Sequence, residues 1–499
     1  MARVRTLRPS RAAWSAVVVL AFAAQAVAAQ RSNVAEQVAA DRALLAKEVY
    51  VTPPAEIATL VTAPWYRNVT LTLQSPDRTH FLRQESDGMP SVQGFGKFHY
   101  YFGGLQVDPA ANRARVLTMR ASAGLSLIDA TTGKTTTVEI PKGATVSSPS
   151  WSPDSRRVAY IANFPDASYV YVADAATGKS GQAARAPLLA TLVTTIDWTQ
   201  DGRHVVAVVV PSLRAPEPRK PAIETGPQVR LWLNGVKSPQ RNFASLLDGP
   251  FDKDLLQYYV TGQLALIDVK THALTRIGAP AMFTSVDPSP DGRYFRVTTM
   301  QRPFSYMVQY SSFGTREQLW DASGKVVAEL WDRPLREAPD STQTGAGFGG
   351  RGTLNGPPGK KFLAWMPSGP GMYYVEPVPS ADSAANGGRA NGGGRAGRGG
   401  RGGSVRAERV VQWMPPYGKD DTKVLYTNDA AVSQLAMSDD AKTLFLGQSS
   451  GGQGEIVAVD LADPPVRHVI LRQRGYTPAF GTGGRGRGFG GRGGPSDAA

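Results

Sequence analysis

The sequence predicts an all-β protein, a β-propeller of about seven four-stranded blades in a complete or incomplete set. Two short marks recur along the chain: a tight turn of the Ser-Pro-Asp-Gly type and a hairpin of the Asp-x-x-Thr-Gly-Lys type. Each lies beside runs of β-branched and aromatic residues. Their spacing is regular, because Asp129 and Asp174 are 45 residues apart, and Asp154 and Asp201 are 47 apart. Four strands with three turns fill that length, which is the period of a propeller blade.

The chemistry of the two marks explains why they form turns. Proline sets φ at the first corner, aspartate accepts hydrogen bonds from nearby backbone, and glycine tolerates a positive φ. We therefore expect strands on both sides of every copy, and few helices. Copies of the first mark lie at Leu73–Asp77, Trp151–Ser155, Trp198–Gly202, Pro288–Gly292 and, in degenerate form, Met437–Asp440. Copies of the second lie at Leu127–Lys134, Val172–Lys179, Leu266–His272, Leu319–Lys325 and Val457–Asp460.

One blade is expected to carry an insertion. Asp174 and Asp268 are 94 residues apart, about one blade length more than the period. The extra residues span about 211–259 and include Pro211–Pro227, which is rich in proline and charge, and the segment Asn242–Tyr259. A pair of β-sandwiches is the alternative architecture, but a recurring blade-length period fits it poorly.

Residues 1–29 are expected to be a secretory signal peptide. Arginines precede the apolar run 13–24, and Ala26-Val27-Ala28 is a small-x-small triplet before the expected cleavage. The run is shorter than the ~20 residues that span a membrane, which argues against the alternative, an uncleaved anchor helix. We expect export to the periplasm or the extracellular space, with no membrane contact after cleavage.

Composition divides the rest of the chain into further parts. Residues 30–51 are expected to be a short helical lead-in, and residues 52–480 the propeller. Two glycine- and arginine-rich stretches interrupt or follow it: a loop at about 380–405 and a tail at 481–499. Neither can bury apolar surface, so both are expected to be disordered.

The formal net charge of +14 does not indicate a nucleic-acid partner. Four arginines lie in the first eleven residues and seven in the two Gly/Arg tracts, which leaves about +3 for the remaining chain. A nearly neutral folded part has no broad basic face. RNA binding by the Gly/Arg tracts is the alternative, but aromatic residues are sparse beside them and an exported protein meets little RNA. We expect linkers there.

No catalytic, metal or cofactor site is predicted. The chain has no cysteine, and its five histidines form no HExxH motif or close pair. One G-x-S-x-G motif contains Ser449, but strand-like sequence follows it, whereas a nucleophile elbow needs a helix there and Asp and His further along. Ser449 is therefore expected in a hairpin loop. Gly347–Gly352 matches GxGxxG, but no helix follows, so no dinucleotide is expected.

Four segments carry a family resemblance: Tyr50–Ile57, Arg219–Pro221 with Gly226-Pro227, Asp254–Tyr259, and Thr284–Gly292 running into Arg302–Tyr306. In this order they resemble the amino-terminal propeller of S9 (prolyl oligopeptidase-type) serine peptidases, above all the glutamyl endopeptidase branch, over most of residues 45–475. In this family an α/β-hydrolase domain with a Ser, Asp, His triad follows the propeller, which limits access to short or unfolded peptides. The resemblance implies a non-catalytic, substrate-gating part of an exported peptidase, inactive alone, with the catalytic domain absent from this chain.

Five side chains are candidates for contacting a peptide substrate or a catalytic α/β-hydrolase domain: Arg302, Phe304, Tyr306, Tyr258 and Tyr259. A cation beside aromatic rings can hold an acidic side chain or seat another domain. Packing inside a blade, with tyrosine hydroxyls bonded locally, is the alternative for each of them. The alternative for the whole chain is a free-standing exported propeller that acts as a binding or scaffold module.

Overall fold

The computed structural model describes residues 54–61, 73–85, 92–120, 122–222, 245–337, 356–378, 407–478 and 480, together with residues 40 and 43. The chain divides into a unit of residues 1–63, which contains helix α2 (Ala55–Val61), and a unit of residues 64–499. The expected signal peptide, the loop at about 380–405 and the tail at 481–499 lie outside the described residues. So does the lead-in at 30–51, except for residues 40 and 43, which are helical.

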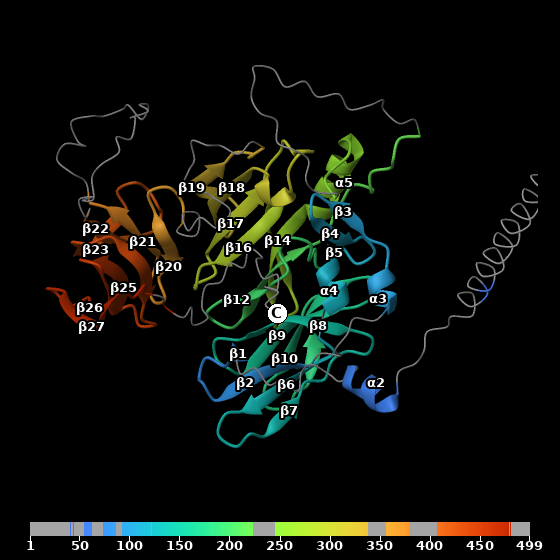
Figure 1. The fold of residues 1–499 in the computed structure, drawn as a ribbon, viewed down its shortest axis with the longest axis horizontal. Helices are drawn as coiled ribbons and strands as arrows, with labels where there is room; N and C mark the ends of the chain where they lie inside the picture. Colours follow the sequence, from blue (N-terminus) through green and yellow to red (C-terminus); the bar gives the residue numbers. More distant parts are fainter. Residues whose placement is uncertain are drawn as a thin grey trace, which may run out of the picture. The chain divides into compact units, whose positions relative to one another are not determined.

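The described part of the second unit contains six four-stranded antiparallel sheets, which are the blades of a propeller (Figure 1). The predicted all-β propeller class is confirmed; the described residues form six such blades, where about seven were expected. Blade 1 consists of β1 (Leu73–Gln74), β2 (His80–Glu85), β6 (Gly124–Asp129) and β7 (Thr135–Thr137). Blade 2 consists of β8 (Thr145–Trp151), β9 (Arg157–Asn163), β10 (Ser168–Asp174) and β11 (Ser180–Gln182). Blade 3 consists of β12 (Asp197–Trp198), β13 (His204–Val209), β14 (Gly262–Asp268) and β15 (Leu274–Ala281). Blade 4 consists of β16 (Phe283–Pro288), β17 (Tyr294–Met300), β18 (Thr315–Asp321) and β19 (Val326–Arg333). Blade 5 consists of β20 (Lys361–Trp365), β21 (Met372–Pro377), β22 (Glu408–Trp413) and β23 (Thr422–Asn428). Blade 6 consists of β24 (Val432–Met437), β25 (Thr443–Ser450), β26 (Gln453–Asp460) and β27 (Val466–Arg474).

Each blade passes through its four strands in chain order, so its connections alternate between two edges of the sheet. The Ser-Pro-Asp-Gly-type turns join strands 1 and 2, and the Asp-x-x-Thr-Gly-Lys-type hairpins join strands 3 and 4. Both sequence marks therefore lie at one edge, which we call the turn edge. The connections between strands 2 and 3 lie at the opposite edge, which we call the insertion edge.

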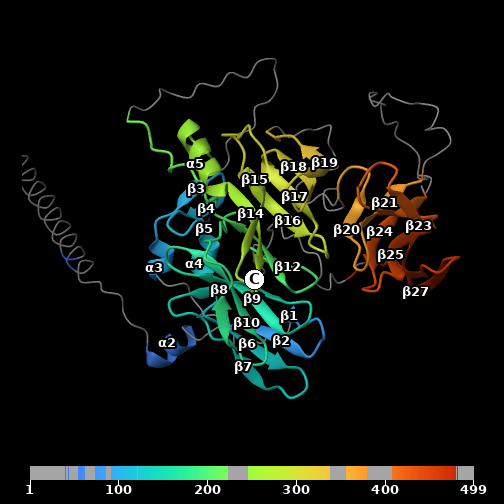
Figure 2. The same cartoon turned by 180° about the vertical axis from the view of Figure 1, so that it is seen from behind.

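Two long insertions with described residues lie at the insertion edge. In blade 1, the described part of residues 86–123 forms α3 (Val92–Gly96), α4 (Arg115–Arg120) and a three-stranded sheet of β3 (Tyr100–Phe102), β4 (Leu105–Asp108) and β5 (Arg113–Ala114), which we call the inserted sheet. In blade 3, the insertion between β13 and β14 contains α5 (Pro250–Val260). Figures 1 and 2 show α5 beside the inserted sheet, and the two share one buried apolar cluster.

The aspartate of each mark holds its own turn together. Ser152 donates its hydroxyl to Asp154 at 2.6 Å, and the backbone N–H of Arg156 donates to the same carboxylate oxygen. In the second mark, the Thr177 hydroxyl and backbone N–H both donate to Asp174, and these bonds lower the pKa of that carboxyl. The hydroxyl-to-carboxylate bond of the first mark recurs in Ser75–Asp77, Thr199–Asp201, Ser289–Asp291 and Ser438–Asp440.

Tryptophan side chains join successive blades. The indole N–H of Trp151 donates to the Leu73 carbonyl at 3.0 Å, that of Trp198 to the Ser150 carbonyl at 3.1 Å, and that of Trp365 to the Asp287 carbonyl at 3.3 Å. Apolar side chains fill the space between the sheets, as where Leu82 and Leu127 of blade 1 pack with Val158 of blade 2. The cores therefore lie between blades, with polar bonds at their margins.

The first described blade strand begins at Leu73. The residues Ala, Glu and Leu in Ala55–Val61 favour a helix, which is what this segment forms. Within the described ranges, no helix is both long enough and apolar enough to cross a membrane.

Candidate functional site: a groove between helix α5 and a proline-rich strap

Helix α5 forms because its sequence has both a start signal and an apolar stripe. Pro250 occupies the first turn, where its missing N–H costs no hydrogen bond, and Asp252 suits the positive end of the helix. Leu255, Leu256, Tyr259 and Val260 then recur at helical spacing and are buried. They pack against the inserted sheet at Phe102, Leu105 and Val107. The opposite face of α5 is left to present polar residues.

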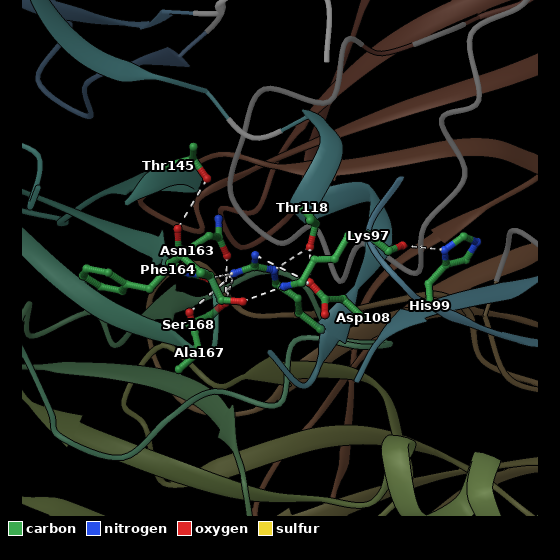
Figure 3. Close-up of polar contacts among 11 residues, drawn as sticks. Lys97, His99, Asp108, Thr118, Thr145, Asn163, Phe164, Ala167 and Ser168 are labelled. Atoms are coloured by element: carbon green, nitrogen blue, oxygen red, sulfur yellow. Dashed lines mark hydrogen bonds and ion pairs between the residues drawn. The ribbon is translucent and has the colours of Figure 1, made fainter. Parts of the chain in front are cut away.

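A buried polar cluster holds the inserted sheet in place. Asp108, only 1% exposed, accepts hydrogen bonds from Lys97 Nζ at 2.8 Å and from the Thr118 hydroxyl at 2.7 Å (Figure 3). Arg113 donates from Nε to Thr118 at 2.9 Å and from a terminal nitrogen to the Phe164 carbonyl of blade 2 at 2.7 Å. Burial lowers the pKa of Arg113, and the nearby Asp108 charge opposes that shift. The cluster therefore ties the inserted sheet to blade 2.

The anchored sheet in turn holds residues 211–218, which we call the strap. Asn112 lies in the turn between β4 and β5, and its side-chain oxygen accepts a hydrogen bond from Arg214 at 2.5 Å. Arg214 also donates to the Tyr258 carbonyl at 2.7 Å, and its guanidinium lies over the Tyr258 ring, 3.7 Å from the centroid. Arg214 thus joins the strap to both the inserted sheet and α5.

Glu217 is the second tie of the strap. Its Oε1 accepts hydrogen bonds from the Tyr259 hydroxyl at 2.8 Å and from the Tyr100 hydroxyl at 3.4 Å. Burial, together with this bond to the negative Glu217, raises the pKa of Tyr259 above its usual value. The strap is therefore fixed by two ionised side chains rather than by apolar packing alone.

A groove of about 330 Å³ lies between the strap and α5. Its apolar lining consists of four prolines with Leu213 and Ala215. The polar part of the lining comes from four side chains of α5 and its end, together with Arg214 and Arg302. The full lining is Pro211, Leu213, Arg214, Ala215, Pro216, Pro218, Asp254, Gln257, Tyr258, Thr261, Pro280 and Arg302. Its size and mixed lining are those of a small-ligand or peptide-end site.

The structure brings the five predicted contact residues together around α5 but gives them different surroundings. Arg302 lines the groove and donates to Asp254 at 2.8 Å and to Gln257 at 2.6 Å. Tyr258 also lines the groove, beneath Arg214. Phe304 and Tyr259 are buried in the apolar cluster, and Tyr306 packs against it with Lys253 3.7 Å from its ring centroid. Two of the five are therefore accessible to a ligand in the groove.

Sequence reasoning missed Arg214, Asn112 and Glu217. Arg214 and Glu217 fall in the proline-rich insertion that the sequence did indicate, but nothing in the pattern identifies their partners. Helix α5 was also missed, although Pro250 and the apolar spacing of Phe251, Leu255 and Tyr259 are a helix signal.

Ser449 lies near the end of β25, paired with Gly454 of β26 across the turn at Gly451-Gly452. The expected hairpin is present, but Ser449 belongs to its first strand rather than to its loop, and the strand β26 follows directly after the turn. His468, downstream in the sequence, is exposed on β27 and paired with Ala458. This segment therefore lacks the strand-turn-helix geometry of a nucleophile elbow.

A second group of charged residues lies on blades 3 and 4, away from the groove lining. Asp197 and Asp287 lie on the first strands of these two blades, and both are half-buried. Burial and the Asp287 charge raise the pKa of Asp197 to about 7. Burial raises the pKa of Asp287 to about 6, against the opposing effect of Arg296, which itself donates to Glu317 at 2.6 Å.

No family model matches this chain. Two curated relatives are both named "Probable glutamyl endopeptidase, chloroplastic". The protein from Oryza sativa subsp. japonica is 28% identical over 347 residues, which cover 67% of this chain and 35% of the relative. The protein from Arabidopsis thaliana is 27% identical over 298 residues, which cover 58% of this chain and 30% of the relative. This chain thus spans about a third of the length of these relatives.

Solved structures with a similar fold have low scores. An oligogalacturonate lyase in complex with manganese has a TM-score of 0.36 and 12% identity, covering 80% of this chain and 76% of that one. A structure from a study of two prolyl endopeptidases has a TM-score of 0.35 and 13% identity, covering 88% of this chain and 48% of that one. The β-propeller domain of the trilobed protease from Pyrococcus furiosus has a TM-score of 0.30 and 11% identity, covering 66% and 72%. All three TM-scores are below 0.5. The two curated relatives confirm the resemblance to glutamyl endopeptidases that was predicted from the sequence. The described blades of this chain form a β-propeller.

Proposed function

We propose that this chain is the substrate-gating propeller of an exported serine peptidase similar to glutamyl endopeptidases. It restricts and positions peptides for an α/β-hydrolase catalytic domain that lies outside residues 1–499 and supplies the serine triad. Export is proposed from the arginines, apolar run and small-x-small triplet of residues 1–29. Peptide substrates and the catalytic domain are proposed from the resemblance to glutamyl endopeptidases.

One observation carries the proposal: segments of separate resemblance to that family converge on the groove. Asp254–Tyr259 is part of α5, and Arg302 reaches α5 from the segment after β17. Arg219–Pro221 directly follows the strap. Residues that are distant in sequence but share this resemblance therefore meet at the insertion edge, which is what a common contact surface for a peptide or a catalytic domain requires.

The test is a cleavage assay with the purified chain and a glutamate-containing peptide. We expect no cleavage above the buffer rate, and no change with Ser449→Ala, because Ser449 pairs with Gly454 in a hairpin. Steady cleavage that Ser449→Ala abolishes would show that the chain is itself the enzyme. Inactivity together with capture of one non-peptidase partner by a stable monomer would instead favour the free-standing binding or scaffold module.

A further inference from the structure

Arg214 is a partly buried cation whose hydrogen-bond partners are all neutral. Its terminal nitrogens donate to the Asn112 side-chain oxygen and to the Tyr258 carbonyl. Its Nε is buried without a hydrogen-bond partner. The Glu217 charge acts on this guanidinium from nearby, but the carboxylate accepts hydrogen bonds from the Tyr259 and Tyr100 hydroxyls rather than from Arg214. Buried charges are normally paired, so an arginine without a bonded carboxylate has donors that can receive an anion.

Arg302, the other arginine of the groove, differs from Arg214 in this respect. It donates to the Asp254 carboxylate at 2.8 Å, and both side chains of this ion pair are exposed. Asp254 therefore neutralises Arg302, and the one remaining positive charge in the lining is that of Arg214. Sequence reasoning favoured Arg302 for an acidic ligand, whereas the pairing in the structure favours Arg214.

The geometry of Arg214 leaves donors for a ligand. A guanidinium has five N–H groups, and Asn112 and Tyr258 take one hydrogen each from its two terminal nitrogens. One N–H remains on each terminal nitrogen, and two N–H groups of one guanidinium can form a fork that binds both oxygens of a carboxylate. Tyr258 lies under the guanidinium and fixes its plane, so the fork is oriented before a ligand arrives.

The other walls of the groove indicate what the carboxylate is attached to. Four prolines with Leu213 and Ala215 offer an apolar surface that an extended chain with small or apolar side chains can follow. Thr261 and Gln257 add polar groups on the α5 side. A volume of about 330 Å³ suits the end of a peptide and is too small for a folded domain.

We propose that the groove is a non-catalytic binding site for a peptide carboxylate, with Arg214 as the carboxylate-binding residue. The carboxylate can be that of the peptide's carboxyl terminus or of an acidic side chain; the chemistry at Arg214 is the same. The choice of a peptide as ligand rests on the function proposed above. The binding site itself would hold one end of a substrate at the insertion edge of blade 3 and its inserted helix.

The experiment is isothermal titration calorimetry of the full chain with four versions of one proline-containing hexapeptide. The last residue is glutamate or glutamine, and the carboxyl terminus is free or amidated. We expect saturable binding for every version that has a carboxylate, and binding at least tenfold weaker for the amidated glutamine version. If removing one of the two carboxylates weakens binding more than removing the other, that carboxylate is the one that Arg214 binds. Equal binding of all four versions, or no binding of any, would overturn the proposal.

Variants locate the site. Arg214→Gln should weaken binding of the charged peptides at least tenfold, whereas Arg214→Lys should retain part of it. The matched control is Arg316→Gln, because Arg316 is an exposed arginine of blade 4 paired with Asp332 and absent from the groove lining. Unchanged binding by a folded Arg214→Gln variant would contradict the proposal. If that variant does not fold, the four-peptide comparison on the unaltered chain still decides. Binding is read without catalysis, so this result is independent of whether a catalytic domain accompanies the propeller.

Discussion

The guanidinium of Arg214 lies 3.7 Å from the ring centroid of Tyr258 and donates to the Tyr258 backbone carbonyl. These two residues are 44 positions apart in the sequence. Their contact exists because the strap and α5 both emerge from the insertion of blade 3 and because the inserted sheet of blade 1 supports them. The groove therefore depends on two insertions at the insertion edge: the insertion of blade 3 forms it, and the inserted sheet of blade 1 supports it.

The buried carboxylate of Asp108 is expected to be essential for this support. Asp108→Asn removes the charge that faces Lys97 and the buried Arg113. Breaking such a buried pair costs about 3 kcal/mol, so the variant should unfold at a lower urea concentration and at a lower temperature. The control is Asp332→Asn in the exposed pair with Arg316, which should change stability by less than about 1 kcal/mol. Equal effects of the two substitutions would contradict the role given to Asp108.

Two glycines of the same hairpin mark should differ in their tolerance of alanine. Gly133 and Gly178 both have a positive φ, near +70°. A Cβ at Gly178 would lie 2.2 Å from the Thr137 carbonyl oxygen of blade 1, whereas a Cβ at Gly133 meets nothing within 4 Å. The strain of the positive φ is common to both, so Gly178→Ala should be the more destabilising by about 2 kcal/mol. Thermal unfolding of the two variants measures this difference, and equal midpoints would show that blades 1 and 2 are not in close contact there.

The tryptophan ties between blades make a third prediction. Trp198→Phe keeps an aromatic ring but removes the N–H that donates to the Ser150 carbonyl, which should cost about 1 kcal/mol. Trp331→Phe is the matched control, because the Trp331 indole N–H has no hydrogen-bond partner among the described residues. Urea unfolding should show a loss for Trp198→Phe and nearly none for Trp331→Phe. A similar loss in both would mean that ring size, not the bond between blades, matters.

Asp197 should make the protein less stable as the pH rises. Its carboxyl has a pKa of about 7 in the folded chain and 3.8 as the ordinary value. Between those two values the folded state holds the proton more tightly than the unfolded state, so stability falls as pH increases. Asp197→Asn should match the original chain near pH 4 and exceed it by at least about 1 kcal/mol at pH 8.

Asp440 is the control of opposite sign for that experiment. The Ser438 hydroxyl and the Lys442 N–H lower the pKa of Asp440, so its contribution to stability is present above the unfolded pKa and is lost as pH falls through the folded one. Asp440→Asn should therefore destabilise more at pH 7 than at pH 3. Unfolding midpoints measured across this range check both variants, and parallel pH profiles for the two would contradict the assignments.

The blades could be predicted from the sequence because their signals are local. Asp154 and Asp174 bond to residues within three positions of themselves, so turn chemistry alone locates the turns and hence the strands. The hairpin at Ser449 follows from the same kind of evidence, since Gly451 and Gly452 supply the turn.

The groove could be predicted only in part, because its contacts join distant residues. Arg302 and Tyr258 stood out as a cation and an aromatic residue in segments of family resemblance, and both line the groove. Arg214 is 102 positions from Asn112, and no periodicity connects them. Which arginine lacks a carboxylate partner depends on Asp254, whose place beside Arg302 follows from helix α5. Local sequence therefore identifies some of the residues that line the groove, but their partners are known only from tertiary contacts.

Sequencing the source DNA through and beyond codon 499 tests the central claim most directly. The claim is that this propeller serves a catalytic α/β-hydrolase domain outside residues 1–499. We predict an open reading frame that continues into such a domain, with a serine in a strand-turn-helix motif followed by Asp and His. A confirmed stop codon with no such domain encoded downstream would contradict the account and leave the chain as a binding module in its own right.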